Sequence, residues 1–430
     1  MFVHIDIDCF FVSAHRTLDN SLFHIPVAVG GRSNLNIFSS KKEIRKISEN
    51  SGAFVSTILT NEGQKTFKEY FVDENGKIRG IITTSSYEAR SYGVKTAMSV
   101  NEALTLCPHL KMLPPNYPLY HDLSTKLKEI LVKEIPLVEQ FSIDEFFGDL
   151  TGYIGDDEIV EFAYYLKKKI FNELKLPVSI GIANTKFLSK LITEYAKPDG
   201  VKYVAADNIG NFIKDIPIKE FPGIGKAFQE RLKGYGIRTL GDIKKNQKLF
   251  YSWKKPGIDL YNRVCGIRDN KLTIEREKKS IGIGRSFDVI FDRIELKRRV
   301  MILCRYLCFL VKKANVNPLT YAILIRYEYR SKSKNYVNVN RIFNEIDFKN
   351  EMVKLFETTD NHKTHGIIQL NITVSNFAKV NEYTYNLFEY EGDLKKRALT
   401  NQMQNLRNKY GIDIIKSGFE IKESENKDKK

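Results

Sequence analysis

Two stretches decide the fold: HIDIDCFF at residues 4–11 and FSIDEFF at residues 141–147. In the first, Asp6 ends an apolar strand. In the second, Asp144 and Glu145 occupy the tip of a predicted β-hairpin, where neighbouring side chains can reach a common point. Hydrophobic residues flank these acids on both sides, and a buried carboxylate is costly unless a cation compensates it. Acids at strand ends and turns are common without a cation, which is the default interpretation of either stretch alone, and the hydrophobic flanks raise the odds of a cation site.

Carboxylates placed in this way suit phosphoryl transfer assisted by metal ions. Transfer to a 3′-hydroxyl uses two Mg²⁺ ions, one that activates the attacking oxygen and one that holds the triphosphate. Mg²⁺ prefers hard oxygen ligands, so the site needs convergent carboxylates and a backbone carbonyl. Asp6, Asp144 and Glu145 meet that requirement, whereas Asp8 stands where the N-cap of the next helix is expected.

The surrounding sequence predicts an α+β protein of about three or four domains. Up to about residue 206, a strand–helix–hairpin–helix–strand order predicts an α/β sandwich with helices on one face. A unit rich in glycine and lysine begins near Asp207, and the charged stretch LTIEREKKS resembles a linker. Beyond it, SFDVI, YAILIRYEY, NYVNVNRIF and IIQLNITVSNF alternate as strands do, mixed with helices at residues 295–313 and 349–358.

Composition gives the first indication of a partner. The 430 residues are 42% hydrophobic and carry a net charge of +16, which attracts polyanions such as nucleic acid or acidic lipid. No run of about 18 apolar residues predicts a membrane span, and no basic region precedes the apolar N-terminus as in a secretion signal. The five cysteines form no CxxC pair, and the spacing of Cys304 and Cys308 indicates core packing rather than a metal site. These features predict a reducing cytoplasm.

The two acidic stretches, in this order and spacing, resemble the Y-family translesion DNA polymerases, nearest to the bacterial DinB and UmuC groups. Three further stretches agree. TTSSYEARSYGVKTAMS (83–99) resembles the fingers motif, GIANTKFLSKLITEYAKPDG (181–200) the palm helix with its KP-x-G lysine, and FPGIGKAFQERLKGYGIRTLGDI (221–243) the thumb hairpin. The resemblance covers about residues 1–270. It implies a right-hand polymerase that copies DNA past damaged bases with low fidelity. A proofreading nuclease would need another set of acids, and the sequence shows none.

The same resemblance implies an α+β, multidomain architecture with palm, fingers, helix-hairpin-helix thumb and a C-terminal α/β little finger. The expected boundaries are palm 1–11 and 116–206, fingers 12–115 with an insertion at about 32–80, thumb 207–272, linker 273–282, little finger 283–380 and C-terminal tail 381–430. Typical members pass almost directly from the glycines at 30–31 to the strand at Ile81. The inserted residues either touch template DNA or decorate a solvated surface, and the second reading is favoured.

The resemblance also implies roles for individual residues. Asp6, Asp144 and Glu145 are the expected catalytic residues and metal ligands, with the Ile7 carbonyl as a further ligand for two Mg²⁺ ions that Mn²⁺ can replace. The expected nucleotide contacts are Phe10, Phe11, Thr84, Tyr87, Arg90 and Lys197. Phe11 matches a steric gate that excludes the 2′-hydroxyl of a ribonucleotide; its alternative is a helix core residue. The arginine and the lysine suit the leaving pyrophosphate, although ordinary surface charge is their default reading.

Primed template DNA is the expected macromolecular partner. The glycines of the thumb hairpin let backbone N–H groups approach a phosphate. The expected DNA contacts are Lys190, Gly223, Gly225, Lys226, Arg285, Arg326, Arg330 and Lys332. In the tail, residues 384–388 resemble a peptide that docks on the replication sliding clamp through Leu387 and Phe388, with threonine in place of the usual leading glutamine. We expect a monomer in the bacterial cytoplasm, associated with the nucleoid.

Two other functions fit parts of the sequence. A catalytically silent relative that binds DNA and recruits another polymerase would have lost the carboxylates, and all three are present. A nucleotide cyclase also uses two metal ions on a similar hairpin, but it would lack the thumb hairpin and the basic third domain.

Overall fold

The computed structural model describes residues 1–33, 35–38, 46–47, 58–59, 63–267, 271–274, 277–378 and 388–421. Contacts divide the chain into two compact units. The first comprises residues 1–31 and 48–276, and the second comprises residues 32–47 and 277–430. Within the described ranges, no helix has the length and apolar character that crossing a membrane requires.

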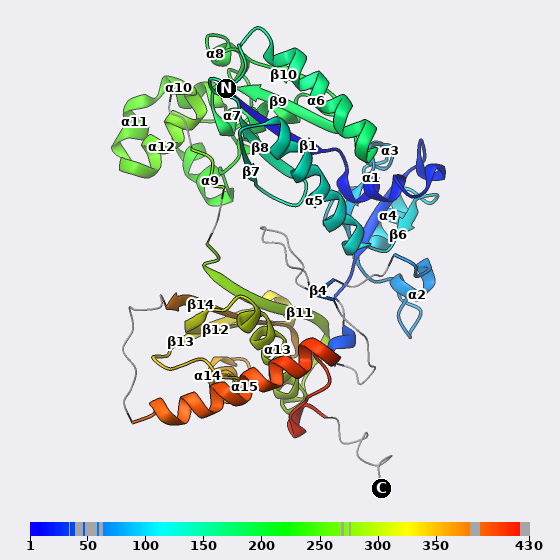
Figure 1. The fold of residues 1–430 in the computed structure, drawn as a ribbon, viewed down its shortest axis with the longest axis vertical. Helices are drawn as coiled ribbons and strands as arrows, with labels where there is room; N and C mark the ends of the chain where they lie inside the picture. The colour runs from blue at the N-terminus through cyan, green and yellow to red at the C-terminus, as the bar shows by residue number, and fades with distance from the viewer. Residues whose placement is uncertain are drawn as a thin grey trace. The chain divides into compact units, whose positions relative to one another are not determined.

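The first unit is built on a five-stranded sheet in the order β10-β9-β1-β8-β7 (Figure 1). Its strands are β1 Phe2–Ile7, β7 Leu137–Gln140, β8 Glu145–Asp149, β9 Val178–Ala183 and β10 Val201–Tyr203. β1 lies in the middle and pairs antiparallel with both β8 and β9. The long helices of this sheet are α5 Tyr117–Glu134, α6 Ile159–Leu174 and α7 Lys186–Glu194. The predicted order of strands and helices is therefore confirmed.

Side chains alternate between the two faces of this sheet. Val3, Ile5 and Ile7 of β1 join a core with the buried side of α5 and α6. The opposite face is covered by α7, which contacts β1 and β9. Gly181 allows this contact, because a Cβ atom there would lie 2.2 Å from the Ser189 carbonyl oxygen. The prediction of helices on one face only was wrong, since it missed this close approach of α7.

A three-stranded sheet in the order β5-β2-β6 forms a second core in the first unit. The elements of this part are α1 Phe10–Arg16, η1 Asn20–Leu22, β2 Val27–Gly31, β4 Ile58–Leu59, α2 Phe67–Phe71, β5 Ile81–Ser85, α3 Tyr87–Ser91, α4 Val100–Leu106 and β6 Lys111–Leu113. Phe71 of α2 is fully buried, and a Cβ atom on Gly30 would lie 2.6 Å from its ring. This part of the inserted segment belongs to the core, so the solvated-surface prediction is wrong for it.

Short helices complete the first unit. They are α8 Ile209–Phe212, η3 Ile218–Glu220, α9 Lys226–Gly234, α10 Leu240–Lys245, α11 Gln247–Ser252 and α12 Lys254–Cys265. Their apolar side chains share one core with Leu188, Leu191 and Ile192 of α7. The helix that covers the charged face of the central sheet is thus also the support of this helical part.

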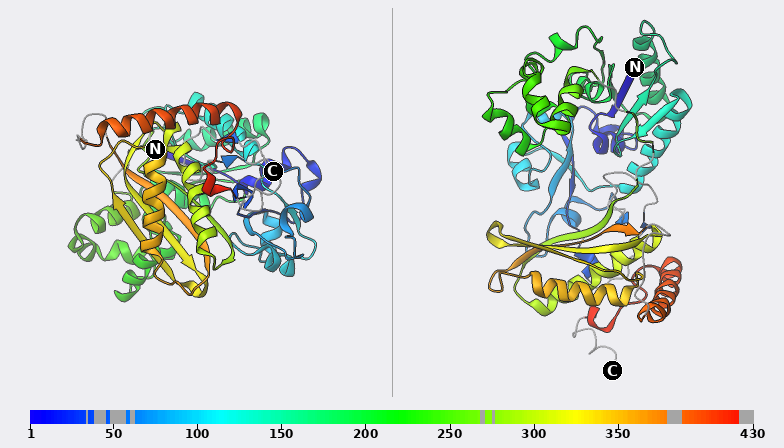
Figure 2. Two further views of the ribbon diagram at one scale, coloured as in Figure 1. Left: turned by 90° about the horizontal axis from the view of Figure 1, so that it is seen from below. Right: turned by 90° about the vertical axis from the view of Figure 1, so that its left-hand side faces the viewer.

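The second unit contains a four-stranded antiparallel sheet in the order β11-β14-β12-β13, with helices on one face (Figure 2). Its elements are η2 Leu35–Phe38, β3 Lys46–Ile47, β11 Ser280–Ile290, α13 Arg293–Lys313, β12 Asn317–Tyr327, η4 Glu328–Arg330, β13 Lys332–Asn338, α14 Glu345–Thr359, β14 Ile367–Ala378, α15 Tyr390–Tyr410 and η5 Gly418–Glu420. The strands and helices predicted between residues 283 and 380 are confirmed. Cys304 and Cys308 are both buried in α13, as their spacing predicts.

Helix α15 and the turn η5 are held in the second unit by buried ion pairs. Glu345 of α14 accepts hydrogen bonds of 2.5 and 3.1 Å from Arg407 of α15, and it lies 2.6 Å from Lys349. Glu420 accepts hydrogen bonds from Arg305 at 2.7 Å and from Lys349 at 2.6 Å. The sequence assigned α15 and η5 to a C-terminal tail, but Arg407 and Glu420 of these elements are paired inside the unit.

The start of the inserted segment also packs on the second unit. Phe38 is 5% exposed, and its ring meets the ring of Phe287 edge-on at 6.2 Å. The Arg299 guanidinium lies 4.5 Å from the Phe38 centroid and 4.7 Å from the Phe287 centroid. Arg298 donates to the Phe38 carbonyl oxygen at 3.2 Å. Cation–π contact and a backbone hydrogen bond therefore fix this turn, which is again not a solvated surface loop.

Glu345→Gln is expected to lower the free energy of unfolding of the second unit by about 3–5 kcal/mol, because it leaves the buried Arg407 guanidinium without its carboxylate. Urea unfolding measures this loss in the transition that belongs to the second unit. Glu351→Gln is the matched control, since Glu351 lies on the same helix in an exposed pair with Lys354. An unchanged midpoint for Glu345→Gln would contradict the prediction.

The difference in the free energy of unfolding between the wild type and Glu345→Gln depends on pH. Burial would raise the pKa of Glu345, but the hydrogen bonds and charges of Arg407 and Lys349 outweigh it, so the folded-state pKa lies below the ordinary value of 4.5. The ionised carboxylate stabilises the fold above that value, and this contribution is lost as the pH falls through the lowered folded-state pKa. The stability difference between the wild type and Glu345→Gln should shrink over that acid range.

Candidate active site

The carboxylates predicted from the sequence meet at the end of β1, on the face that α7 covers. Asp6 and Glu145 are register partners on β1 and β8. One ligand atom from each of them and one from His4 lie within 4.8 Å of one another. Asp144 directly precedes β8; its carboxylate accepts a 2.5 Å hydrogen bond from Ser142, and its carbonyl oxygen accepts one from the Ile7 N–H at 3.1 Å.

Two lysines on or just after α7 compensate this charge. The Lys197 ammonium lies 3.1 Å from Asp6, and the Lys190 ammonium lies 2.5 Å from Glu145. Burial raises the pKa of Asp6; Lys197 opposes this rise, whereas the neighbouring Asp144 and Glu145 reinforce it. Burial acts the same way on Glu145, but His4 and Lys190 reverse it and the pKa lies below its ordinary value. Lys190, predicted as a DNA contact, thus has a carboxylate partner in this structure.

His4 is a member of the cluster that the sequence did not single out. Its ring is fully buried, with Nδ1 2.9 Å from the Thr193 hydroxyl of α7. Its Nε2 lies 3.9 Å from Glu145, too far for a hydrogen bond, and finds no hydrogen-bond partner among the described residues. Burial lowers the pKa of His4 to about 4, so the ring is neutral at neutral pH.

The donor set fits a divalent cation. Three carboxylates converge where burial penalises their negative charge, and an orphaned imidazole nitrogen faces one of them. Hard oxygen ligands of this kind suit Mg²⁺ or Mn²⁺. Asp6, Asp144 and Glu145 are the residues that could hold such an ion, and Ile7 lies between Asp6 and Asp8 at the end of the strand.

The predicted nucleotide contacts lie on α1, on β5 with α3, and after α7. Phe10 is 2% exposed and packs in the core, whereas Phe11 is half-buried and its ring stacks on Tyr120 at 4.2 Å. Thr84 lies in β5 and is half-buried. The Arg90 guanidinium lies 4.9 Å from the ring of Tyr87, at the start of α3.

Asp8 does not cap α1, contrary to the sequence prediction. The N-cap position is Cys9, in a left-handed conformation with φ of 48°. Asp8 is 3% exposed, and its carboxylate accepts hydrogen bonds from Ser179 of β9, from the Tyr87 hydroxyl and from the Asp199 N–H. Ser179 lies far away in the sequence, so no local pattern could have predicted this contact.

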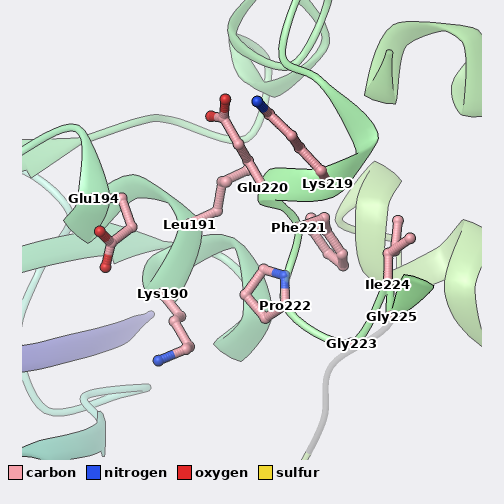
Figure 3. Close-up of a pocket in the computed structure, with 10 residues that line it drawn as sticks. All are labelled: Lys190, Leu191, Glu194, Lys219, Glu220, Phe221, Pro222, Gly223, Ile224 and Gly225. Carbon is pink, nitrogen blue, oxygen red and sulfur yellow. The ribbon is translucent and has the colours of Figure 1, made fainter. Parts of the chain in front are cut away.

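A pocket of about 750 Å³ lies between α7 and the turn that precedes α9 (Figure 3). Lys190 and Glu194 line it from α7, and the residues from Lys219 to Gly225 line it from the turn. Gly223 has φ of +98°, a conformation that L side chains rarely adopt. Gly225 is the N-cap of α9, which starts at Lys226. The predicted hairpin residues are therefore brought beside Lys190.

The predicted contacts in the second unit do not all share one face of the sheet. Arg326 and Lys332 are exposed register partners on β12 and β13. Arg285 instead aligns with Leu370, which faces the helices and is fully buried. Arg330 is exposed in the turn η4, with φ of 63°. Leu387 lies outside the described residues.

The face of the second unit's sheet opposite α13 and α14 is polar and partly basic. It carries Arg326, Lys332 and Lys334 together with Gln369 and Asn371. Gly284 also belongs to this face, and a Cβ atom there would collide with the Asn371 amide at 1.3 Å. Glycine at this position thus lets the polar side chain lie flat on the sheet.

Comparison with known proteins identifies the family. The profile of the impB/mucB/samB family matches residues 5–194, that of the IMS family HHH motif residues 206–237, and that of the impB/mucB/samB family C-terminal domain residues 278–387. The chain is 32% identical over 289 residues to the DNA polymerase IV of Photorhabdus laumondii, covering 66% of this chain and 70% of that protein. It is 30% identical over 360 residues to the DNA polymerase IV of Clostridioides difficile, covering 81% and 98%.

The chain belongs to the Y family of DNA polymerases. Solved structures of this Y family agree in fold. A chimera of the Dbh and Dpo4 polymerases matches with a TM-score of 0.67 at 21% identity, covering 87% of this chain and 98% of that one. An insertion ternary complex of Dbh DNA polymerase matches with a TM-score of 0.54 at 20% identity, with the same coverage. The right-hand fold with a helix-hairpin-helix motif and a C-terminal domain, as expected from the sequence, is confirmed for this Y-family chain.

Proposed function

We propose that this protein is a DNA-directed DNA polymerase that performs translesion synthesis, adding dNTPs to a primer 3′-hydroxyl opposite damaged template bases without proofreading. The observation that carries the proposal is the cluster of Asp6, Glu145 and His4 at one end of β1, beside two lysines and with Asp144 near enough to raise the pKa of Asp6. The relatives that are named DNA polymerase IV support the proposal that the reaction is DNA synthesis. The palm, fingers, thumb and little-finger boundaries stated above are part of the proposal.

In this proposal Asp6, Asp144, Glu145 and the Ile7 carbonyl hold two Mg²⁺ ions, which Mn²⁺ can replace. When bound, the ions lower the pKa of the primer hydroxyl and neutralise charge on the triphosphate. Lys197 is placed to share its charge between Asp6 and a phosphate, because its ammonium already lies at the carboxylate cluster. Lys190 does the same beside Glu145.

The incoming nucleotide is contacted by residues of α1, β5 and α3 in this proposal. Arg90 offers several donors to the triphosphate, and Thr84 and Tyr87 line the same side. The Phe11 ring is the gate against a 2′-hydroxyl. Its support is the ring of Tyr120, which stacks on it at 4.2 Å and is fully buried, so the gate cannot retreat into the core.

Primed DNA binds through its phosphates in this proposal. The turn at Gly223 and Gly225 offers backbone N–H groups, and the pocket beside Lys190 accepts the primer backbone. The polar face with Arg326 and Lys332 contacts the duplex without reading its sequence. Arg285 and Arg330 are also proposed to contact DNA, from positions outside that face.

Other parts of the proposal concern partners and location. Phe388 is 97% exposed, which suits a peptide that docks on the sliding clamp. The proposed protein is a monomer in the bacterial cytoplasm, where it associates with nucleoid DNA. The alternative is a silent DNA-binding scaffold that recruits another polymerase. Retention of all three carboxylates favours the enzyme.

Combined Asp144→Ala and Glu145→Ala substitution is expected to reduce extension of a labelled primer at least about 10³-fold, equivalent to about 4 kcal/mol of transition-state stabilisation. Gel analysis of extension with dNTPs and Mg²⁺, on intact and abasic templates, measures the effect. Glu129→Gln, at an exposed position of α5, is the control. DNA binding without any extension by the wild type would instead support the scaffold.

Phe11→Ala is expected to lower the preference for dNTPs over rNTPs by roughly 10²-fold or more, because it removes the ring that excludes the 2′-hydroxyl. Single-nucleotide insertion with each substrate gives the ratio of kcat/KM values. Phe11→Tyr keeps the ring and is expected to keep the preference. A selectivity that is unchanged in Phe11→Ala would show that Phe11 is only a packing residue.

Lys332→Gln is expected to weaken binding of primed DNA equally for unrelated sequences and to reduce the slope of log K against log salt by about 1. Fluorescence anisotropy at several salt concentrations measures both effects. Lys354→Gln removes an exposed charge from α14, on the helix side of the same unit, and is expected to leave the slope unchanged. Equal slopes for the wild type and Lys332→Gln would remove this face from the DNA interface.

A further inference from the structure

Asp8 is a buried carboxylate that the proposed metal site does not use. It follows β1 and, like Asp6, lies on the side that α7 covers. Ser179 of β9 donates its hydroxyl to both carboxylate oxygens, at 3.0 and 2.9 Å. The Tyr87 hydroxyl donates to Oδ1 at 3.1 Å, and the Asp199 N–H donates to Oδ2 at 2.7 Å.

Two of these three donors, Tyr87 and Asp199, belong to segments that carry a proposed triphosphate contact. Tyr87 begins α3, and its ring lies under the Arg90 guanidinium at 4.9 Å. Asp199 follows Lys197 by two residues, in the turn that ends α7. One carboxylate therefore connects the arginine segment and the lysine segment, which are about a hundred residues apart in the sequence.

The contacts suit a carboxylate better than an amide. A carboxylate only accepts hydrogen bonds, and every group that faces Asp8 is a donor. An amide of the same shape has one acceptor oxygen in place of two and no negative charge, so the Ser179 and Tyr87 hydroxyls would have to turn and accept from its NH₂ group. Burial of a carboxylate is costly, so its hydrogen bonds must recover the lost hydration, and bonds to a charged acceptor are about twice as strong as neutral ones.

We propose that Asp8 is a positioning residue, which fixes the Tyr87–Arg90 pair and the turn after Lys197 in the arrangement that binds the triphosphate of an incoming nucleotide. This inference rests on the proposed polymerase function. Asp8 touches neither the substrate nor the reacting atoms; it acts through Tyr87 and Asp199. Ser179 anchors Asp8 itself to the central sheet.

Asp8→Asn tests this role by direct binding of a dNTP, without chemistry. The protein is mixed with a primer–template whose primer ends in a dideoxynucleotide, and the Kd of the complementary dNTP is measured by titration. We expect the Kd to rise about 10-fold, while the Kd of the primer–template changes less than about twofold. Asp19→Asn, at an exposed position, is the control of the same chemistry and should match the wild type.

A double-mutant cycle with Tyr87→Phe separates positioning from general loosening of the fold. If Asp8 acts through Tyr87, the two substitutions together raise the dNTP Kd less than the product of their separate effects. Additive effects, or a parallel loss of DNA affinity, overturn the proposal, and so does an unchanged Kd in Asp8→Asn. If Asp8→Asn does not fold, Ser179→Ala takes its place in the same measurements, because it removes the anchor of Asp8 and leaves both links intact.

Primer extension by the wild type and Asp19→Asn distinguishes this inference from the function on which it rests. Extension by both, together with an unchanged dNTP Kd in Asp8→Asn, rejects the role of Asp8 and leaves the polymerase in place. No extension by either rejects the polymerase itself.

Discussion

A β-strand sends successive side chains to opposite faces of its sheet, and along β1 this period divides the first unit into an apolar side and a charged side. Val3, Ile5 and Ile7 fill the core beneath α5 and α6, whereas His4 and Asp6 are carried to the side of α7. A shift of register by one residue would exchange the two sets and bury the carboxylate in the hydrocarbon core. Lys190 of α7, Lys197 just after it and Ser179 of β9 are arranged around this one constraint.

The sequence was sufficient for the elements that depend on local pattern. The apolar run before Asp6 predicts β1, and the hairpin tip predicts that Asp144 and Glu145 can reach a common point. The strands and helices of the C-terminal unit follow from alternation and helical spacing in the same way. Family membership, suggested by five ordered motifs, agrees with the comparisons.

What the sequence could not predict depends on contacts between distant segments. Asp8 has the local signature of an N-cap, and only Ser179 and Asp199, which lie on other elements, show that its carboxylate is used elsewhere. Lys190 has the signature of a surface cation, but Glu145 binds it. The insertion at about residues 32–80 was predicted to be a solvated surface because its packing partners are also distant in the sequence. Whether a charge is buried depends on a partner that no local window contains.

Because of the inserted segment, the second unit is discontinuous in the sequence. The chain leaves the first unit after residue 31, contributes the turn Leu35–Phe38 to the second, and returns before its later crossing near residue 276. Phe38 covers Arg299 and Phe287, so the second unit is assembled from two separate stretches of sequence. A fragment or graft that begins at residue 277 is thus an incomplete module: it exposes an arginine–phenylalanine surface that the intact chain closes with residues from its own N-terminal third.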